Sequence, residues 1–419
     1  MKEKIKRFFK KIGPGFITGA ADDDPSGIAT YIQTGISFGY NQLWTALFSF
    51  PFMSVIQEMC GRIGLVTGKG LSGVIKKHYN QSILFFAVTL LLIANIINIG
   101  ADLGAMAVSA KLVINLPFAF WLIVLTAITL FLEVYVTYSV YAKFLKYLTL
   151  SLFAYIIVAF VVKQDWSKIF LSTLIPTFSL SREYLLNIVA ILGTTISPYL
   201  FFWEAYEEVE EEIVHHKIKT MGKGIPKIRK SDVLAMKSDT IFGMFFSNLV
   251  TFFIIITAAS TLRSQNILGI VTADKAALAL RPIAGDFAYL LFAFGIIGVG
   301  LLAIPILSGS ASYAISEVFG WNAGLSLKLK KAQGFYGVII CSTLLGLLVN
   351  FIGIKPFQML YYTAVLNGII APPLMILIVL ISNNKNIMGR YTNSKTSNMM
   401  GSFITGIMTL AVLALLINL

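Results

Sequence analysis

Residues 13–35 read GPGFITGAADDDPSGIATYIQTG, an apolar segment with three consecutive aspartates and a proline near its centre. A proline inside a helix removes a backbone hydrogen bond and breaks or kinks the helix. A carboxylate at the centre of a membrane helix costs about 2.5–3.5 kcal/mol, so such residues are rare and usually functional. The segment therefore predicts a helix that is interrupted at Asp24 and Pro25. It also predicts that the polar groups at the interruption have a functional role.

The composition places the chain in a lipid bilayer. Of its 419 residues, 57% are hydrophobic and 13% are charged, and the mean hydropathy is +0.80. A helix needs about 20 apolar residues to cross a hydrocarbon core about 30 Å thick. We therefore predict an all-α integral membrane protein with eleven transmembrane helices. The predicted spans are 12–36, 43–66, 83–110, 118–137, 147–162, 184–206, 240–262, 286–313, 335–353, 357–382 and 402–418.

The distribution of basic residues predicts the topology, because Lys and Arg collect in cytoplasmic loops. With a cytoplasmic N-terminus, all but eight of the 33 basic residues fall on the cytoplasmic side. The eight exceptions are Lys111, Lys163, Lys168, Arg182, Arg263, Lys275, Arg281 and Lys355. We expect a multi-pass protein of the plasma membrane with an extracellular C-terminus. The net charge of +13 then indicates contact with anionic lipids and does not require nucleic acid.

A second interrupted helix indicates an internal repeat. Residues 191–208 read ILGTTISPYLFFWEAYEE, in which Pro198 again breaks an apolar segment. Paired broken helices at corresponding positions of two halves are typical of transporters built from inverted repeats, which bind their substrate near the bilayer midplane. We predict a single domain over 1–419 with five-helix repeats at 1–162 and 184–382 and an extra helix at 402–418.

The residue types at the two breaks favour a hard cation. Asp24 supplies a carboxylate, Ser26, Thr194 and Ser197 supply hydroxyls, and the unwound backbone supplies carbonyls. Mg²⁺ prefers oxygen ligands, keeps several waters and needs only one or two carboxylates from a protein. Gly27 removes a side chain beside Asp24 and leaves room for a partly hydrated ion.

Further acidic residues have less definite roles. Asp22 and Asp23 point to other helical faces than Asp24, so we expect one to line an access path and neighbouring helix ends to satisfy the other. Glu204 and Glu208 share a helical face at i and i+4 and are interpreted either as a cation-attracting vestibule or as part of a solvated helix end. For residues 210–212 we expect the solvated helix end.

The two interrupted segments resemble the first and sixth spans of the NRAMP metal transporters, whose motifs are Asp-Pro-Gly-Asn and Met-Pro-His. The resemblance extends over nearly the whole chain and implies a LeuT-type fold with alternating access. It aligns Asp24 with the ion-binding aspartate and Gly27 with the ion-binding asparagine. It aligns Thr194 with the position whose backbone carbonyl binds metal and Ser197 with the metal-binding methionine. Pro25 and Pro198 align with the prolines of the two motifs, and Ser26 aligns with the glycine of the first. Tyr199 aligns with the histidine and Asn248 with a polar residue of span seven.

Departures from the family motifs imply a different substrate. Without the methionine and the asparagine, the chain is similar to the branch known as NRAMP-related magnesium transporters, in which the site is wider and lined only by oxygen. The family's span-three motif Asp-Leu-Ala-Glu keeps its aspartate here as Asp102, but Ala105 replaces the glutamate. With Tyr199 in place of the histidine, two titrating groups are lost. We expect uptake of Mg²⁺, and also of Mn²⁺, without proton coupling.

Three alternatives remain. A proton-coupled transporter of Mn²⁺ or Fe²⁺ and an amino-acid transporter would share the architecture, although Asp24 argues against a substrate carboxylate at the break. A membrane prenyltransferase would need a second acidic cluster, and Asp102, Asp274 and Asp286 are isolated. We expect no enzymatic activity, no cofactor besides the transported ion and no obligate protein partner.

Overall fold

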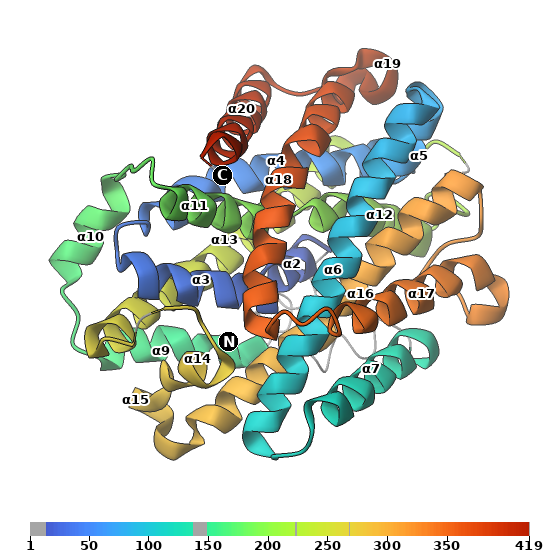
Figure 1. Ribbon diagram of the computed structural model, residues 1–419. Helices are drawn as coiled ribbons and strands as arrows, with labels where there is room; N and C mark the ends of the chain where they lie inside the picture. The colour runs from blue at the N-terminus through green and yellow to red at the C-terminus, as the bar shows by residue number, and fades with distance from the viewer. Residues whose placement is uncertain (1–13, 137–148, 223, 268, 419) are drawn as a thin grey trace, which may run out of the picture.

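The computed structural model describes residues 14–136, 149–222, 224–267 and 269–418, and their helices surround a central group that contains α2, α3, α12 and α13 (Figure 1). The α-helices are α2 (Pro14–Asp22), α3 (Pro25–Phe38), α4 (Trp44–Thr67), α5 (Leu71–His78), α6 (Gln81–Val113), α7 (Phe118–Tyr135), α9 (Phe153–Val161), α10 (Trp166–Leu174), α11 (Arg182–Thr195), α12 (Pro198–Val214), α13 (Lys230–Thr261), α14 (Ala273–Leu278), α15 (Arg281–Ala284), α16 (Ala288–Phe319), α17 (Gln333–Val349), α18 (Pro356–Asn383), α19 (Lys385–Met388) and α20 (Lys395–Ile417). The 3-10 turns are η1 (Thr149–Leu152), η2 (Arg263–Gln265), η3 (Gly285–Phe287), η4 (Leu329–Lys331) and η5 (Gly389–Tyr391).

The prediction of an all-α membrane protein is confirmed. In the described part of the chain, seven helical segments are long and apolar enough to cross a membrane. The other four predicted spans coincide with α2–α3, α4, η1–α9 and α17, which are interrupted, carry buried polar side chains or are shorter than 18 residues. The basic N-terminal residues, Lys143 and Lys146, and Lys223 lie outside the described residues, as do the beginnings of the first and fifth spans.

Both predicted helix breaks are present and lie in the middle of the molecule. The first separates α2 from α3 at Asp23 and Asp24, and the second separates α11 from α12 at Ile196 and Ser197. Helix α2 packs against α12, and α3 packs against α11. The two broken helices therefore run antiparallel with their breaks side by side, which is the arrangement that inverted repeats generate.

Glycines allow the central helices to approach closely. A Cβ atom at Gly64 of α4 would lie 2.1 Å from the carbonyl oxygen of Ala205 on α12. One at Gly193 of α11 would lie 2.1 Å from the carbonyl oxygen of Ala364 on α18. Membrane helices associate through such small residues because lipid provides no hydrophobic drive for their contact. The glycines thus fix the second broken helix against its neighbours.

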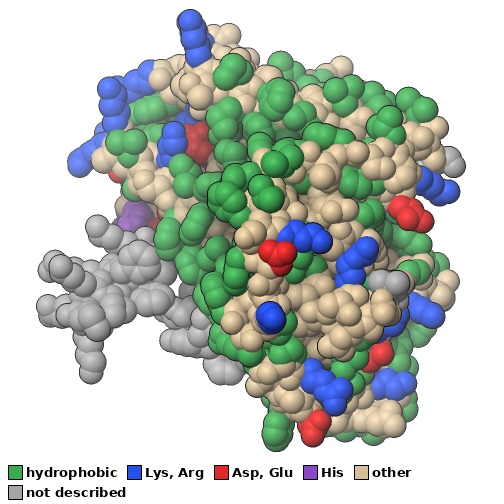
Figure 2. Space-filling view, turned by 90° about the vertical axis from the view of Figure 1, so that its left-hand side faces the viewer, with side chains coloured by type: hydrophobic (Ala, Val, Ile, Leu, Met, Phe, Trp, Pro, Cys, Tyr) green, Lys and Arg blue, Asp and Glu red, His purple; other side chains and the backbone are tan. Residues whose placement is uncertain are grey.

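The outer surface is apolar, as a lipid-facing surface must be. Phe86 of α6, Ile123 and Phe131 of α7 and Phe160 of α9 are between 53% and 65% exposed. Hydrophobic side chains also make up much of the face shown in Figure 2, with charged side chains scattered across it. Soluble monomers rarely expose so much apolar surface, so burial in a bilayer accounts for it.

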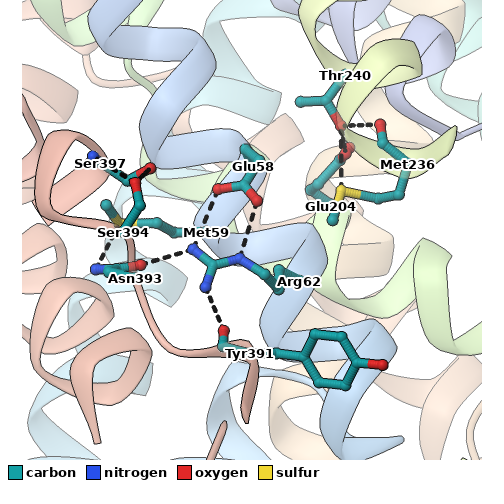
Figure 3. A network of polar contacts seen from close by, with 10 residues as sticks. All are labelled: Glu58, Met59, Arg62, Glu204, Met236, Thr240, Tyr391, Asn393, Ser394 and Ser397. Atoms are coloured by element: carbon teal, nitrogen blue, oxygen red, sulfur yellow. Dashed lines mark hydrogen bonds and ion pairs between the residues drawn. The ribbon is translucent and has the colours of Figure 1, made fainter. Parts of the chain in front are cut away.

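A buried ion pair fastens α4 to the segment before α20. The Arg62 guanidinium donates to both oxygens of Glu58, at 2.9 and 3.1 Å, and to Asn393 Oδ1 at 2.6 Å (Figure 3). It also donates to the Tyr391 carbonyl at 2.5 Å. Both charged residues are buried. All three guanidinium nitrogens therefore donate hydrogen bonds, and a buried pair bonded in this way specifies how its elements dock.

We predict that Arg62→Ala destabilises the protein more than simultaneous replacement of both partners. The single change leaves the Glu58 carboxylate buried without a counter-charge, which costs roughly 3–5 kcal/mol, whereas a buried pair replaced by apolar residues is often nearly neutral. Thermal unfolding in detergent of Arg62→Ala and of Arg62→Met/Glu58→Met provides the measurement. Equal losses for the two variants would contradict this account of the pair.

Candidate functional site

Asp24 lies at the first break with both carboxylate oxygens engaged. It is the N-cap residue of α3, with Pro25 at the first helical position, where the absent proline N–H costs no hydrogen bond. Asp24 Oδ1 accepts from Gly27 N at 2.8 Å and from Ser26 Oγ at 2.6 Å. Asp24 Oδ2 accepts from Asn98 Nδ2 of α6 at 2.8 Å. The carboxylate is therefore held rigidly at the positive end of a helix.

The second break offers hydroxyl and carbonyl oxygens. Ser197 Oγ donates to the carbonyls of Gly193 and Thr194, at 2.9 and 2.8 Å, so its hydroxyl turns back over the last turn of α11. Tyr199 OH donates at 3.0 Å to the carbonyl of Ala21, in the last turn of α2. Tyr199 thus joins the second broken helix to the first.

Gly27 and Thr194 mark the closest approach of the two breaks. A Cβ atom at Gly27 would lie 3.1 Å from Thr194 Oγ1, 3.3 Å from Tyr31 Cε2 and 3.4 Å from the carbonyl oxygen of Asp22. The absence of a side chain at position 27 is what lets the Thr194 hydroxyl and the Asp22 carbonyl face the same point. Thr194 is 1% exposed and Asp22 is fully buried, so these distances leave little free space at that point.

The three consecutive aspartates do not converge. Asp22 and Asp23 both turn to α13, where Ser247 Oγ donates to Asp22 Oδ2 at 2.5 Å and to Asp23 Oδ1 at 3.4 Å, whereas Asp24 turns to α6. In the described part of the chain, Asp22 Oδ1 has no hydrogen-bond partner. Only Asp24 therefore presents its carboxylate at the junction of α3 and α6.

Asp102 lies one helical turn beyond Asn98 on α6. It is fully buried, and neither carboxylate oxygen has a hydrogen-bond partner among the described residues. Asn98 donates to the Asp24 carboxylate, and its own Oδ1 has no hydrogen-bond partner among the described residues. Asp102 is thus a second buried acid on the same side of the break.

The site has four buried carboxyl groups and no basic partner among the described residues. Asp22, Asp23, Asp24 and Asp102 are at most 2% exposed. The ion pairs found among the described residues are Arg62–Glu58, His215–Glu211 and Lys217–Asp232, and none of them involves these aspartates. Nor do three or more His, Cys, Asp or Glu in that part of the chain form a ready-made metal cluster. Buried carboxylates without a counter-charge are costly, so this arrangement calls for a cation or protons.

Glu204 lies beside the site on α12 and is also fully buried. Its carboxylate accepts from Thr18 Oγ1 of α2 at 2.5 Å. It also accepts from Thr240 Oγ1 of α13 at 2.8 Å (Figure 3). It bridges two helices and lines no open vestibule in this conformation. Glu212, further along α12, is only 1% exposed, so the expectation of a solvated helix end is wrong for that residue, because one face of α12 stays packed as far as Glu212.

Asn248 stands apart from the breaks. Its side chain lies against α4, next to Ser49 and Met53. The residue that contacts the acidic segment from α13 is its neighbour Ser247.

The sequence interpretation missed Asn98 and Ser247. A signal for Asn98 existed, since Asn95, Asn98 and Asp102 recur at intervals of three and four residues in an otherwise apolar span, which places them on one helical face. Ser247 had no comparable signal, because single serines are common in membrane helices.

Solved structures share this fold. A manganese transporter of Eremococcus coleocola matches with a TM-score of 0.74 at 15% identity, over 97% of this chain and 85% of that one. Mhp1, a transporter of the nucleobase-cation-symport-1 family, matches with a TM-score of 0.59 at 14% identity, over 97% of this chain and 91% of that one. Likeness at such low identity establishes the LeuT-type fold and nothing finer.

Relatives in sequence span nearly the full chain. The divalent metal cation transporter MntH of Caldanaerobacter subterraneus subsp. tengcongensis is 25% identical over 96% of this chain and 91% of its own length. MntH of Erwinia tasmaniensis is 25% identical over 96% of this chain and 92% of its own length. The family described as natural resistance-associated macrophage protein-like matches residues 15–418. The chain therefore belongs to the Nramp family, whose members are membrane transporters and not enzymes.

Proposed function

We propose that the protein takes up divalent cations by alternating access, chiefly Mg²⁺ and also Mn²⁺, through the junction of the two helix breaks. The MntH relatives are divalent metal cation transporters, and the Eremococcus protein is a manganese transporter. Both support a divalent cation as the substrate. The ion itself is the cargo, and no separate cofactor is involved. The cytoplasmic N-terminus, the extracellular C-terminus and the plasma membrane belong to the same proposal.

The observation that carries the proposal is the charge of the site. Asp22, Asp23, Asp24 and Asp102 are buried with no Lys or Arg paired to them in the described chain. An anionic substrate would meet only repulsion there. A divalent cation would relieve the largest electrostatic cost in the membrane interior.

The preference for Mg²⁺ rests on the oxygen chemistry of the breaks. The Asp24 carboxylate, the Thr194 and Ser197 hydroxyls and the backbone carbonyls at the breaks are hard donors, and Mg²⁺ accepts a site with one carboxylate because it keeps part of its water shell. A thioether at position 197 would favour softer ions. We therefore assign Asp24, Gly27, Thr194 and Ser197 to the ion, with Asn98 holding the carboxylate in place.

Polar contacts close the site on both sides. On one side, Glu204 joins Thr18 to Thr240. On the other, Asn187 Nδ2 of α11 donates to Thr34 Oγ1 of α3 at 2.9 Å, and Tyr361 OH of α18 donates to Asn187 Oδ1 at 3.1 Å. We infer that these two sets of contacts break alternately as the site opens to either side.

Titration calorimetry of the purified protein tests the substrate class. Separate titrations with Mg²⁺, Mn²⁺ and a panel of amino acids should give heat for the two ions and none for the amino acids. Binding of an amino acid in the absence of metal would favour the amino-acid transporter, and binding of Mn²⁺ without Mg²⁺ would favour the transition-metal transporter.

We predict that transport is not coupled to protons, because Ala105 and Tyr199 occupy two positions where the resemblance leads us to expect titrating residues. The membrane potential then drives uptake. Two charges that cross about 100 mV gain roughly 4.6 kcal/mol, or about 2.3 kcal/mol each, enough for more than thousandfold accumulation. The pH inside proteoliposomes should stay constant during Mg²⁺ uptake. Acidification in proportion to metal flux, in vesicles clamped at zero potential, would contradict this.

A further inference from the structure

A basic cavity of about 470 Å³ lies away from the helix breaks, where α5, the segment after α12 and the segment after α16 meet. Four lysines line this basic cavity: Lys69, Lys76, Lys77 and Lys219. None of them takes part in the ion pairs found among the described residues. Lys69 Nζ and Lys76 Nζ donate only to backbone carbonyls, those of Gly222, Glu317 and Val318. Their charges are thus left without an anion.

The two carboxylates in the wall are satisfied by other groups. Glu317 accepts from Gly70 N, Gly73 N and Ser72 Oγ at 2.9, 2.7 and 2.8 Å, which caps the start of α5. Glu210 accepts from Tyr313 OH at 2.8 Å and from Ser326 Oγ at 3.3 Å. Neither turns its carboxylate to a lysine, so the basic cavity keeps an excess of positive charge.

The positive charge of the basic cavity affects the pKa of His78, at the end of α5. Partial burial, together with the charges of Lys77 and Lys69, lowers the pKa of His78. An anion that binds these lysines should raise the pKa of His78 again, because it cancels part of the positive potential.

An apolar groove of about 440 Å³ adjoins the basic cavity. Leu92 and Ile96 of α6, Ile315 of α16 and Leu345 of α17 help to line the groove. Trp321 lines both the groove and the basic cavity. Its indole is stacked on Phe319, with ring centroids 5.0 Å apart, and the two residues are 45% and 62% exposed. The indole therefore stands between a charged space and an apolar one.

We propose that the basic cavity and the apolar groove together bind one anionic phospholipid. The lysines hold its phosphate, the groove holds part of an acyl chain, and Trp321 lies at the level between them. Tryptophan is enriched at this level of a bilayer, and basic pockets between membrane helices on the cytoplasmic side suit anionic head groups. A free phosphate ion would occupy the basic cavity alone and leave the exposed groove without an occupant.

Quenching of tryptophan fluorescence by brominated lipids tests the proposal on the full chain in phosphatidylcholine vesicles. Phosphatidylglycerol with brominated acyl chains should quench more strongly than brominated phosphatidylcholine at the same mole fraction. Trp321→Phe should abolish the difference, because none of the other four tryptophans lines the basic cavity or the apolar groove. Equal quenching by the two lipids, or a difference that survives in Trp321→Phe, would overturn the proposal.

Charge variants test the head-group site. Lys77→Gln/Lys219→Gln removes two charges that form no hydrogen bond or ion pair with the described residues, and it should weaken the preference for phosphatidylglycerol about thirtyfold, about fivefold per charge. Lys111→Gln/Lys168→Gln, an equal change at exposed lysines remote from the cavity, should leave it unchanged. An equal loss in both variants would overturn the proposal. A second result would also overturn the proposal. If the protein bound ATP in EDTA and without anionic lipid, and this binding required Lys77 and Lys219, the cavity would be a site for a free phosphate compound.

Discussion

Replacement of Asp24 by asparagine is expected to reduce uptake of Mg²⁺ and Mn²⁺ into proteoliposomes to the background of protein-free vesicles. Asn98 and the N-terminus of α3 hold the Asp24 carboxylate at the junction of the breaks, whereas Asp22 and Asp23 turn to α13. Neither of these two neighbours is therefore placed to compensate the charge of an ion there, and Asp102 lies one helical turn beyond Asn98 on α6. The measurement is initial metal uptake, with thermal unfolding recorded for each variant.

Asparagine is the sharper substitution because it separates charge from folding. Asp24 Oδ1 caps α3 by accepting from Gly27 N at 2.8 Å, and asparagine caps helices as well as aspartate does. Asp24→Ala should also abolish uptake but lose about 1 kcal/mol of stability with the cap. Asp286→Asn, at an exposed position, removes the same charge away from the breaks and should transport normally. Normal uptake by a well-folded Asp24→Asn protein would refute the proposed site.

The combined change Gly27→Asn/Ser197→Met is expected to increase the affinity of the site for softer ions such as Cd²⁺. The gain in binding free energy should exceed the sum of the gains from the two single changes. A thioether attracts Cd²⁺ or Mn²⁺ only as a direct ligand, and an ion that keeps its water stays too far from position 197. The asparagine would displace the Thr194 hydroxyl, which lies 3.1 Å from the Cβ position of Gly27, and bring an amide oxygen against the ion beside Asp24. The narrower site should strip the ion so that the sulfur can reach it.

A double-mutant cycle of Cd²⁺ and Mg²⁺ dissociation constants measures this coupling. Residues that share one site typically couple by about 0.5–3 kcal/mol, and we expect the combined variant to bind Cd²⁺ more tightly and Mg²⁺ more weakly by such an excess. Strong Cd²⁺ binding by Ser197→Met alone would show that the ion already contacts position 197 directly. Additive changes would equally contradict the partly hydrated ion.

The positions of both helix breaks could be predicted from sequence, because the cause is local. Pro25 and Pro198 each disfavour a continuous helix for a local steric reason, and the structure has breaks directly before both. Pro51 and Pro305 lie inside continuous helices, so the polar residues next to Pro25 and Pro198 were a necessary part of the signal. The apolar spans could also be predicted from sequence, because their length and composition reflect the thickness of the bilayer. The exact ends of the helices could not be predicted, since α13 begins at Lys230, ten residues before the predicted span.

The directions of the side chains could not be predicted from sequence. Asp22, Asp23 and Asp24 are adjacent, yet one hydroxyl on α13 and one amide on α6 draw them apart. Both partners lie more than 70 positions away along the chain, so only the packing of the helices brings them together. Glu212 shows the same limit, since a charged residue near a polar loop reads as solvated but is buried here.

Mg²⁺ flux into proteoliposomes under an inside-negative potential tests the central claim most directly, with a fluorescent Mg²⁺ indicator inside the vesicles. The account predicts saturable Mg²⁺ uptake by the unmodified protein, inhibition by external Mn²⁺ and no uptake by the Asp24→Asn protein. Mn²⁺ uptake that proceeds without any Mg²⁺ uptake, and that excess Mg²⁺ does not inhibit, would show that the oxygen-lined junction is not a magnesium site.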